Sequence, residues 1–172
     1  MNDNFDSDRG GLNFETAYFA GGCFWGVEHL MKKEPGVISV EPGYMGGHFP
    51  NPSYEDVCTG DTGHAETVKV VFDAAVTSYE TLAKLFFEIH DPTHFNRQGP
   101  DIGPQYRSVV FYNGQEQKST ADRLVMELIK KGYDVATEVL PAGEFWVAED
   151  YHHSYYDRKG TQPYCHSYVK RF

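Results

Sequence analysis

A cysteine stands where a strand pattern passes into a helix pattern. Cys23 follows Gly21-Gly22 and precedes Phe24-Trp25-Gly26. A thiol at a helix N-terminus lies near the positive end of the helix dipole and near free main-chain N–H groups, and both favour the nucleophilic thiolate. Two interpretations are open from these residues alone: Cys23 is a nucleophile, or it is a small buried hydrophobe between glycines. Likewise, Phe24 and Trp25 are either core residues or the walls of a small apolar pocket.

Two loop-to-strand junctions carry further reactive side chains. The loop that begins at Asn51 ends in Gly63-His64-Ala65-Glu66, where a strand pattern starts. A carboxyl at such a junction can be half buried, raised in pKa and used as a general acid, whereas the alternative for Glu66 is a solvated glutamate. The loop from Asn96 to Ser108 contains an acid and a phenol, Asp101 and Tyr106, which are equally compatible with a structural hydrogen-bond cluster.

The cysteine count excludes a disulfide framework. Three cysteines, Cys23, Cys58 and Cys165, are an odd number and are spread along the chain. At least one thiol must therefore be unpaired. We expect the reactivity of these thiols to matter more than any stapling role.

Length and charge narrow the class of protein. The 172 residues suffice for one compact domain, so we expect a single domain over 1–172. The 15 basic and 25 acidic side chains give a net charge of -10, which argues against nucleic-acid and membrane partners. No segment approaches the roughly 18 consecutive apolar residues of a membrane span. Residues 1–10 carry three aspartates where a signal peptide would be basic and then apolar. We expect a cytoplasmic protein with residues 1–13 as a loose N-terminal extension.

The elements that must position these residues follow from periodicity. Alternating or β-favouring patterns predict five strands, at 14–20, 37–44, 67–72, 106–112 and 135–140. One helix begins at or beside Cys23 and ends before Pro35-Gly36. A second follows a capping box of Thr77 and Glu80. A third is capped by Asn113 and Glu116, ends at Gly132 and has the buried stripe Ala121, Leu124, Val125, Leu128 and Ile129.

The element order predicts an α+β fold. The first six elements run β-α-β-β-α-β, the order of a ferredoxin-like unit in which both helices cover one face of a mixed sheet. We expect a two-layer αβ sandwich with this core, an extra helix and strand, and a long irregular C-terminal tail, residues 143–172, that wraps the surface. Two loops, 46–65 and 91–105, are longer than packing requires, which is typical of functional loops.

Taken together, these segments resemble the methionine sulfoxide reductase A family, the peptide-methionine (S)-S-oxide reductases, over nearly the whole chain. The resemblance rests on ordered motifs: Gly22-Cys23-Phe24-Trp25-Gly26, the block from Tyr54 through Cys58 to Gly63-His64-Ala65-Glu66, His90-Asp91-Pro92, Asn96-Arg97-Gln98-Gly99 and Gln105-Tyr106-Arg107-Ser108. Each motif is short, but their co-occurrence in this order is highly specific. The αβ-sandwich fold of that family agrees with the element order above.

The resemblance implies a role for each motif residue: Cys23 is the nucleophile, Glu66 the acid, Tyr54 and Tyr106 bond the sulfoxide oxygen, Phe24 and Trp25 hold the S-methyl group, and Asp101 polarises the site through water or a tyrosine. The implied substrate is methionine (S)-sulfoxide, free or in proteins, and no cofactor is needed. A sulfoxide sulfur becomes electrophilic only when its oxygen is protonated or strongly hydrogen-bonded. Thiolate attack then releases methionine and leaves a sulfenic acid, which a second thiol converts to a disulfide.

In the family the resolving cysteine lies in the C-terminal tail, which implies Cys165, whereas the position of Cys58 is usually not required. The chain departs from the commonest pattern because its tail, from Gln162 to Phe172, lacks a glycine-rich stretch and a fourth cysteine. A Cys23–Cys165 disulfide is therefore expected to be reduced directly by thioredoxin or a similar dithiol, on a monomeric protein. Four loop residues also differ from the usual ones and are expected to alter substrate fit: His94, Phe95, Pro100 and Pro104.

Two other functions are compatible with some of the same residues. A Cys–His hydrolase would use Cys23 activated by His64, His152 or His153. A zinc-binding module would combine Cys58, His64, Cys165 and His166, although neither pair has C-x-x-C or H-x(3-5)-H spacing.

Overall fold

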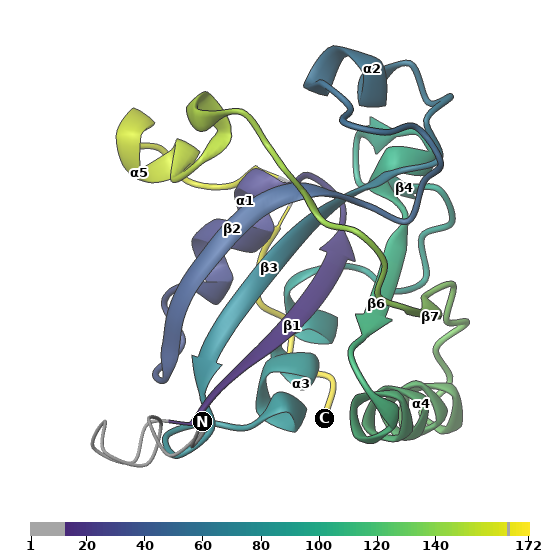
Figure 1. Ribbon diagram of the computed structural model, residues 1–172. Coiled ribbons are helices and arrows are strands. Elements are labelled where there is room, and N and C mark those ends of the chain that lie inside the picture. The colour runs from purple at the N-terminus through teal and green to yellow at the C-terminus, as the bar shows by residue number, and fades with distance from the viewer. Residues whose placement is uncertain (1–12, 165) are drawn as a thin grey trace, which may run out of the picture.

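The computed structural model describes residues 13–164 and 166–172 and is built on a six-stranded sheet in the order β7-β6-β1-β3-β2-β8 (Figure 1). Cys165 and residues 1–12 lie outside the described residues, so the loose N-terminal extension stays a prediction. None of the described helices is long and apolar enough to cross a membrane.

The centre of the sheet has the predicted ferredoxin-like topology. Its strands are β1 (Phe14–Gly21), β2 (Val37–Met45), β3 (Ala65–Asp73) and β6 (Ser108–Tyr112), and all neighbours among them are antiparallel. Helices α1 (Phe24–Met31) and α3 (Tyr79–Ile89) make the two crossovers. The sheet is extended by β7 (Glu138–Pro141), which is parallel to β6, and by β8 (Trp146–Val147), which is antiparallel to β2 and was not predicted. The α+β sandwich is confirmed.

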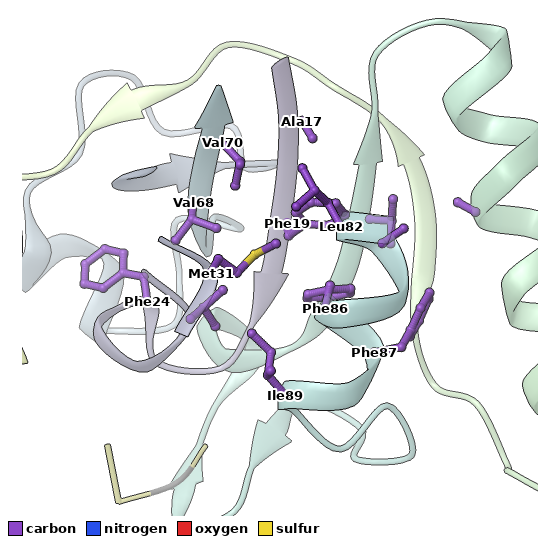
Figure 2. Packing of buried hydrophobic residues seen from close by; sticks show 14 of the residues in the cluster. Ala17, Phe19, Phe24, Met31, Val68, Val70, Leu82, Phe86, Phe87 and Ile89 are labelled. Atoms are coloured by element: carbon purple, nitrogen blue, oxygen red, sulfur yellow. The ribbon is translucent and has the colours of Figure 1, made fainter. Parts of the chain in front are cut away.

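Side-chain alternation along the strands divides the core into two faces. Ala17 and Phe19 of β1 pack in the larger cluster, with α1, α3 and α4 (Gln115–Lys130), whereas Ala20 packs on the opposite face. Figure 2 shows Phe19 among the side chains of α3, and its ring stacks on Phe86 with centroids 4.9 Å apart. The opposite face is covered by the segment that follows β7. The helices thus cover one face of the sheet.

Two predicted helix starts are wrong. The N-cap of α3 is Ser78, whose Oγ accepts the N–H of Thr81 at 3.1 Å. Thr77 does not form the expected capping box, because its own N–H bonds the carbonyl of Asp73 and completes the turn after β3. The N-cap of α4 is a glycine without a side-chain bond, and the Asn113 N–H instead donates to the Gln117 side chain.

The buried stripe predicted for α4 is correct for three of its five members. Ala121, Leu124 and Leu128 are buried, but Val125 is only partly buried and Ile129 is 47% exposed. The helix lies at the side of the sheet (Figure 1), so only a narrow face reaches the core. Its end was predicted correctly: Gly132, with φ +99°, follows the helix.

The long loops contain short elements that the periodicity did not indicate. Residues 46–65 include α2 (Tyr54–Cys58), and Ser53 and Asp56 form a capping box at its N-terminus. Residues 91–105 include a hairpin of β4 (Arg97–Gln98) and β5 (Asp101–Ile102), and the 3₁₀ turn η1 (Pro104–Tyr106) delays the start of β6 to Ser108. The tail forms β8, the 3₁₀ turn η2 (Asp150–His152) and α5 (Tyr155–Lys159). The strand predicted at 135–140 is β7, and it begins at Glu138.

Candidate active site

The thiol of Cys23 lies at the N-terminus of α1. Cys23 is the N-cap residue and is 6% exposed, and its carbonyl accepts the N–H of Gly26 at 3.2 Å. The preceding Gly22 has φ +91°, and a Cβ there would lie 2.6 Å from the side chain of Gln98. Only glycine fits this turn. The strand end therefore turns sharply into α1 and places the thiol at the positive end of an eight-residue helix.

The carboxyl of Glu66 is buried against the same helix end. Glu66, on β3, is 1% exposed, and its Oε1 accepts the main-chain N–H of Phe24 at 3.1 Å. Its Oε2 is buried and bonds no group of the described residues. Burial raises the pKa of Glu66 to about 8; the Phe24 N–H opposes this shift and the charge of Asp101 adds to it. The side chain is therefore not a solvated strand-end glutamate, and at neutral pH it carries a proton.

Two phenols lie near this carboxyl. Tyr54 opens α2 and Tyr106 ends η1, and the ring of Tyr54 stacks on Phe24 with centroids 6.5 Å apart. Burial, then the nearby Glu66, raises the pKa of both phenols, so both remain O–H donors. Cys58 lies on α2, and its thiol is near the Tyr54 hydroxyl. The pKa of this thiol is raised, because partial removal from water outweighs the contact with Tyr54, which lowers the pKa.

Asp101 lies on the small hairpin, opposite Gln98. The hydroxyl of Tyr164 donates to its two carboxylate oxygens, at 2.9 and 3.1 Å. Its charge acts on the pKa of Glu66 and of Tyr106. Asp101 is thus an acidic neighbour of the Glu66 carboxyl.

The aromatic pair after Cys23 is enclosed by residues of the tail. His152 lies 5.1 Å from the ring of Phe24 and 5.6 Å from that of Trp25, measured between centroids, and Tyr155 stacks on Trp25 at 3.7 Å. From the sequence, His152 was expected only as the base of a hydrolase, and no role was predicted for Tyr155. Their signal was the aromatic, histidine-rich composition of the tail, which has no periodicity to place it.

A carboxylate of the tail, Glu149, connects the tail to β2 and α2 by hydrogen bonds. Glu149 accepts the hydroxyl of Tyr44 and the main-chain N–H of Tyr54, both at 3.0 Å. Burial would raise the pKa of Glu149, but these hydrogen bonds hold it below its ordinary value. Glu149 was not predicted, because nothing in its sequence surroundings indicates that it reaches α2.

The C-terminal tail also contacts the loop of Cys23. The ring of His166 bonds the carbonyl of Gly21 at 2.7 Å, and a Cβ on Gly26 would lie 2.1 Å from its Nδ1. His166 and Tyr164, the two sequence neighbours of Cys165, are therefore both held beside the site. Cys165 itself lies outside the described residues.

The histidines considered for a hydrolase or a zinc site hydrogen-bond main-chain groups or the Trp25 indole. His64 accepts the N–H of residue 47 and donates to the carbonyl of residue 49; His153 bonds the carbonyl of residue 148; His152 accepts the indole N–H of Trp25. Among the described residues, no group of three or more His, Cys, Asp or Glu side chains is arranged to hold a metal ion. Each of these rings thus has at least one hydrogen-bond partner that is neither a nucleophile nor a metal.

Comparison with known proteins agrees with this geometry. Residues 15–172 match the family described as Peptide methionine sulfoxide reductase. The peptide methionine sulfoxide reductase MsrA of Saccharolobus solfataricus is 53% identical over 152 residues, which cover 88% of this chain and 86% of that protein. Reduced Mxr1 from Saccharomyces cerevisiae has a TM-score of 0.85 at 34% identity, covering 92% of this chain and 93% of that one. Mxr1 in complex with Trx2 has a TM-score of 0.61 at 24% identity, covering 90% and 89%, which shows the fold. The chain belongs to the peptide methionine sulfoxide reductase family, and it is an oxidoreductase.

Proposed function

We propose that this reductase converts methionine (S)-sulfoxide to methionine, with Cys23 as nucleophile and Glu66 as proton donor. The observation that carries the proposal is the state of the Glu66 carboxyl. It is buried at the N-terminus of α1, one oxygen bonds the Phe24 N–H, and the other is unpartnered among the described residues. A carboxyl with a pKa of about 8 holds its proton at neutral pH and can give it to a substrate oxygen.

The reaction balances without a cofactor. The sulfoxide oxygen takes a proton from Glu66 and hydrogen bonds from Tyr54 and Tyr106, which makes the sulfur electrophilic. The Cys23 thiolate attacks that sulfur, the oxygen passes to the cysteine, methionine leaves, and Cys23 remains as a sulfenic acid. The sulfoxide is reduced by two electrons and the cysteine is oxidised by two.

The substrate methyl group is proposed to lie between Phe24 and Trp25. Both rings follow the nucleophile directly, and a tail residue packs against each of them: His152 against Phe24 and Tyr155 against Trp25. Their apolar faces suit an S-methyl group. Asp101 is proposed to act on this site through its charge and through a bound water or tyrosine.

Cys165 is proposed as the resolving thiol, which condenses with the sulfenic acid to a Cys23–Cys165 disulfide and releases water. The attachment of Tyr164 to Asp101 and of His166 to Gly21 supports this choice over Cys58. Because the chain has no fourth cysteine, a dithiol of the thioredoxin type would reduce this disulfide directly. Three cysteines without a disulfide framework suit a reducing compartment, and we propose that the protein acts in the cytoplasm as a monomer.

Incubation of the purified protein with dithiothreitol and an equal mixture of methionine (S)-sulfoxide and (R)-sulfoxide tests the proposal. We expect methionine to accumulate until only the R epimer remains, and we expect none from the Cys23→Ser variant. Absence of methionine, or equal consumption of both epimers, would overturn the proposed function.

A further inference from the structure

The indole of Trp25 is fixed from two directions by the tail. Its Nε1–H donates to Nδ1 of His152 at 2.9 Å, in the plane of the ring. On its face, the ring of Tyr155 stacks with centroids 3.7 Å apart and planes within 7° of parallel. Trp25 belongs to α1, whereas His152 and Tyr155 come from η2 and α5, more than a hundred residues later. The hydrogen bond prevents the indole from rotating in its own plane, and the stacked ring of Tyr155 prevents it from tilting out of that plane.

The hydrogen bond determines which nitrogen of His152 carries the proton. An indole N–H only donates, so Nδ1 accepts and the proton of the neutral ring is on Nε2. That Nε2 is buried, has no hydrogen-bond partner among the described residues and lies 4.0 Å from a carboxylate oxygen of Glu149. Burial lowers the pKa of His152 to about 4, although Glu149 opposes the shift, so the ring is neutral at pH 7 and Nδ1 keeps its lone pair.

His152 is unfavourable as a simple core residue. It is 0% exposed and packs against the rings of Phe24 and Tyr54, with centroids at 5.1 and 4.4 Å. A buried N–H without a hydrogen bond costs stability, and a phenylalanine would fill the same place without that cost. The benefit that histidine gives over phenylalanine is the acceptor for the Trp25 indole N–H.

We propose that His152 is a positioning residue that sets the size of the substrate pocket: by locking the Trp25 indole, it makes the pocket fit an S-methyl group and reject larger S-alkyl groups. The inference rests on the proposed role of Trp25 as a wall of that pocket. An indole free to rotate would give way to one more methylene, whereas a locked indole would not.

The test compares kcat/KM for methionine sulfoxide and ethionine sulfoxide, which differ by one methylene. In a rigid apolar pocket one methylene is worth about 10 to 200-fold, so we expect at least about tenfold preference for the methyl substrate in the wild type. His152→Phe, which lacks the acceptor, should lose most of this preference, and His152→Gln, whose amide oxygen can accept, should restore part of it. His153→Phe is the matched control, because the ring of His153 bonds the carbonyl of Ala148 and not Trp25, and the ratio for this variant should equal that of the wild type.

A spectroscopic measurement checks the hydrogen bond between Trp25 and His152 independently of enzyme activity. The protein has two tryptophans, so Trp146→Phe leaves the indole N–H resonance of Trp25 alone in the NMR spectrum. His152→Phe should move this resonance upfield, as expected for a lost hydrogen bond, and His153→Phe should not. If His152→Phe does not fold, the smaller His152→Leu removes the same acceptor.

The outcomes separate this inference from the proposed function. Loss of the methyl preference in both Trp25→Ala and the acceptor-free His152 variants supports the inference. Loss in Trp25→Ala alone overturns the role of His152 and leaves the proposed function standing. If Trp25→Ala keeps the wild-type preference, the assignment of the pocket itself is wrong.

Discussion

The main-chain N–H of Phe24 donates a hydrogen bond to the carboxyl of Glu66, with 3.1 Å between nitrogen and oxygen. Phe24 directly follows Cys23, so this bond joins the helix that carries the thiol to the strand that carries the acid. It also satisfies an N–H of the first turn of α1, whose N-cap side chain makes no capping bond. The bond therefore holds the Glu66 carboxyl beside the helix end that carries the thiol.

Glu66→Gln should lower the rate of methionine formation by about 10² to 10⁴, the usual value of general acid catalysis. The amide oxygen can still accept the Phe24 N–H, so the fold should be retained, but an amide cannot supply the proton. Single-turnover rates measure the effect. Glu41→Gln, on the neighbouring strand β2, is the control, and a Glu66→Gln rate close to that of the wild type would remove Glu66 from the mechanism.

The raised pKa of Glu66 also predicts a pH dependence of stability. Its pKa rises from 4.5 to about 8 in the folded protein, mainly through burial. Below the ordinary value the group is protonated in both states. As pH rises, Glu66 ionises first in the unfolded chain. The stability that the neutral carboxyl gives therefore falls progressively, and it is lost as pH passes the pKa of Glu66 in the folded protein.

Thermal unfolding of wild type and Glu66→Gln checks this sign. Because glutamine does not ionise, the melting temperature of Glu66→Gln relative to the wild type should increase between pH 4 and pH 8. A difference that is constant over this range would show that Glu66 ionises normally in the folded state.

Gly26→Ala should release the C-terminal tail. A Cβ at Gly26 would lie 2.1 Å from Nδ1 of His166, and overpacking of this kind typically costs about 1–3 kcal/mol. We expect faster hydrogen exchange at the N–H of Val169, which bonds the carbonyl of Glu88 at 2.7 Å. Gly143→Ala, where nothing lies within 4 Å of the new Cβ, should exchange like the wild type. Unchanged exchange in Gly26→Ala would mean that His166 does not hold the tail.

The two remaining thiols should behave differently during turnover. Cys165→Ser should stall as a sulfenic acid that a dimedone-type reagent traps, because the first step is complete and resolution is missing. Cys58→Ser should turn over with thioredoxin much like the wild type. Mass mapping of the oxidised wild type distinguishes the alternatives: a dominant Cys23–Cys58 disulfide would assign resolution to Cys58.

Periodicity predicted the central topology, since the strands and helices of the ferredoxin-like unit bury continuous apolar stripes. It did not predict α2 or the hairpin at 97–102, because five-residue helices and two-residue strands are too short for a period to show. The motifs indicated the region of Cys23 and Glu66. Glu66 is buried against Phe24, which is 42 positions away in the sequence, and His152 contacts Trp25, which is 127 positions away. A local sequence pattern contains no information on such distant pairs.

The most direct test of thiolate attack by Cys23 counts methionine in a single turnover. Fully reduced protein, freed of reductant, is mixed with excess methionine (S)-sulfoxide, quenched and analysed for methionine. We expect about one methionine per chain from the wild type and also from Cys165→Ser, because chemistry at Cys23 precedes resolution, and none from Cys23→Ser. Methionine formed by Cys23→Ser in the same amount would contradict the account.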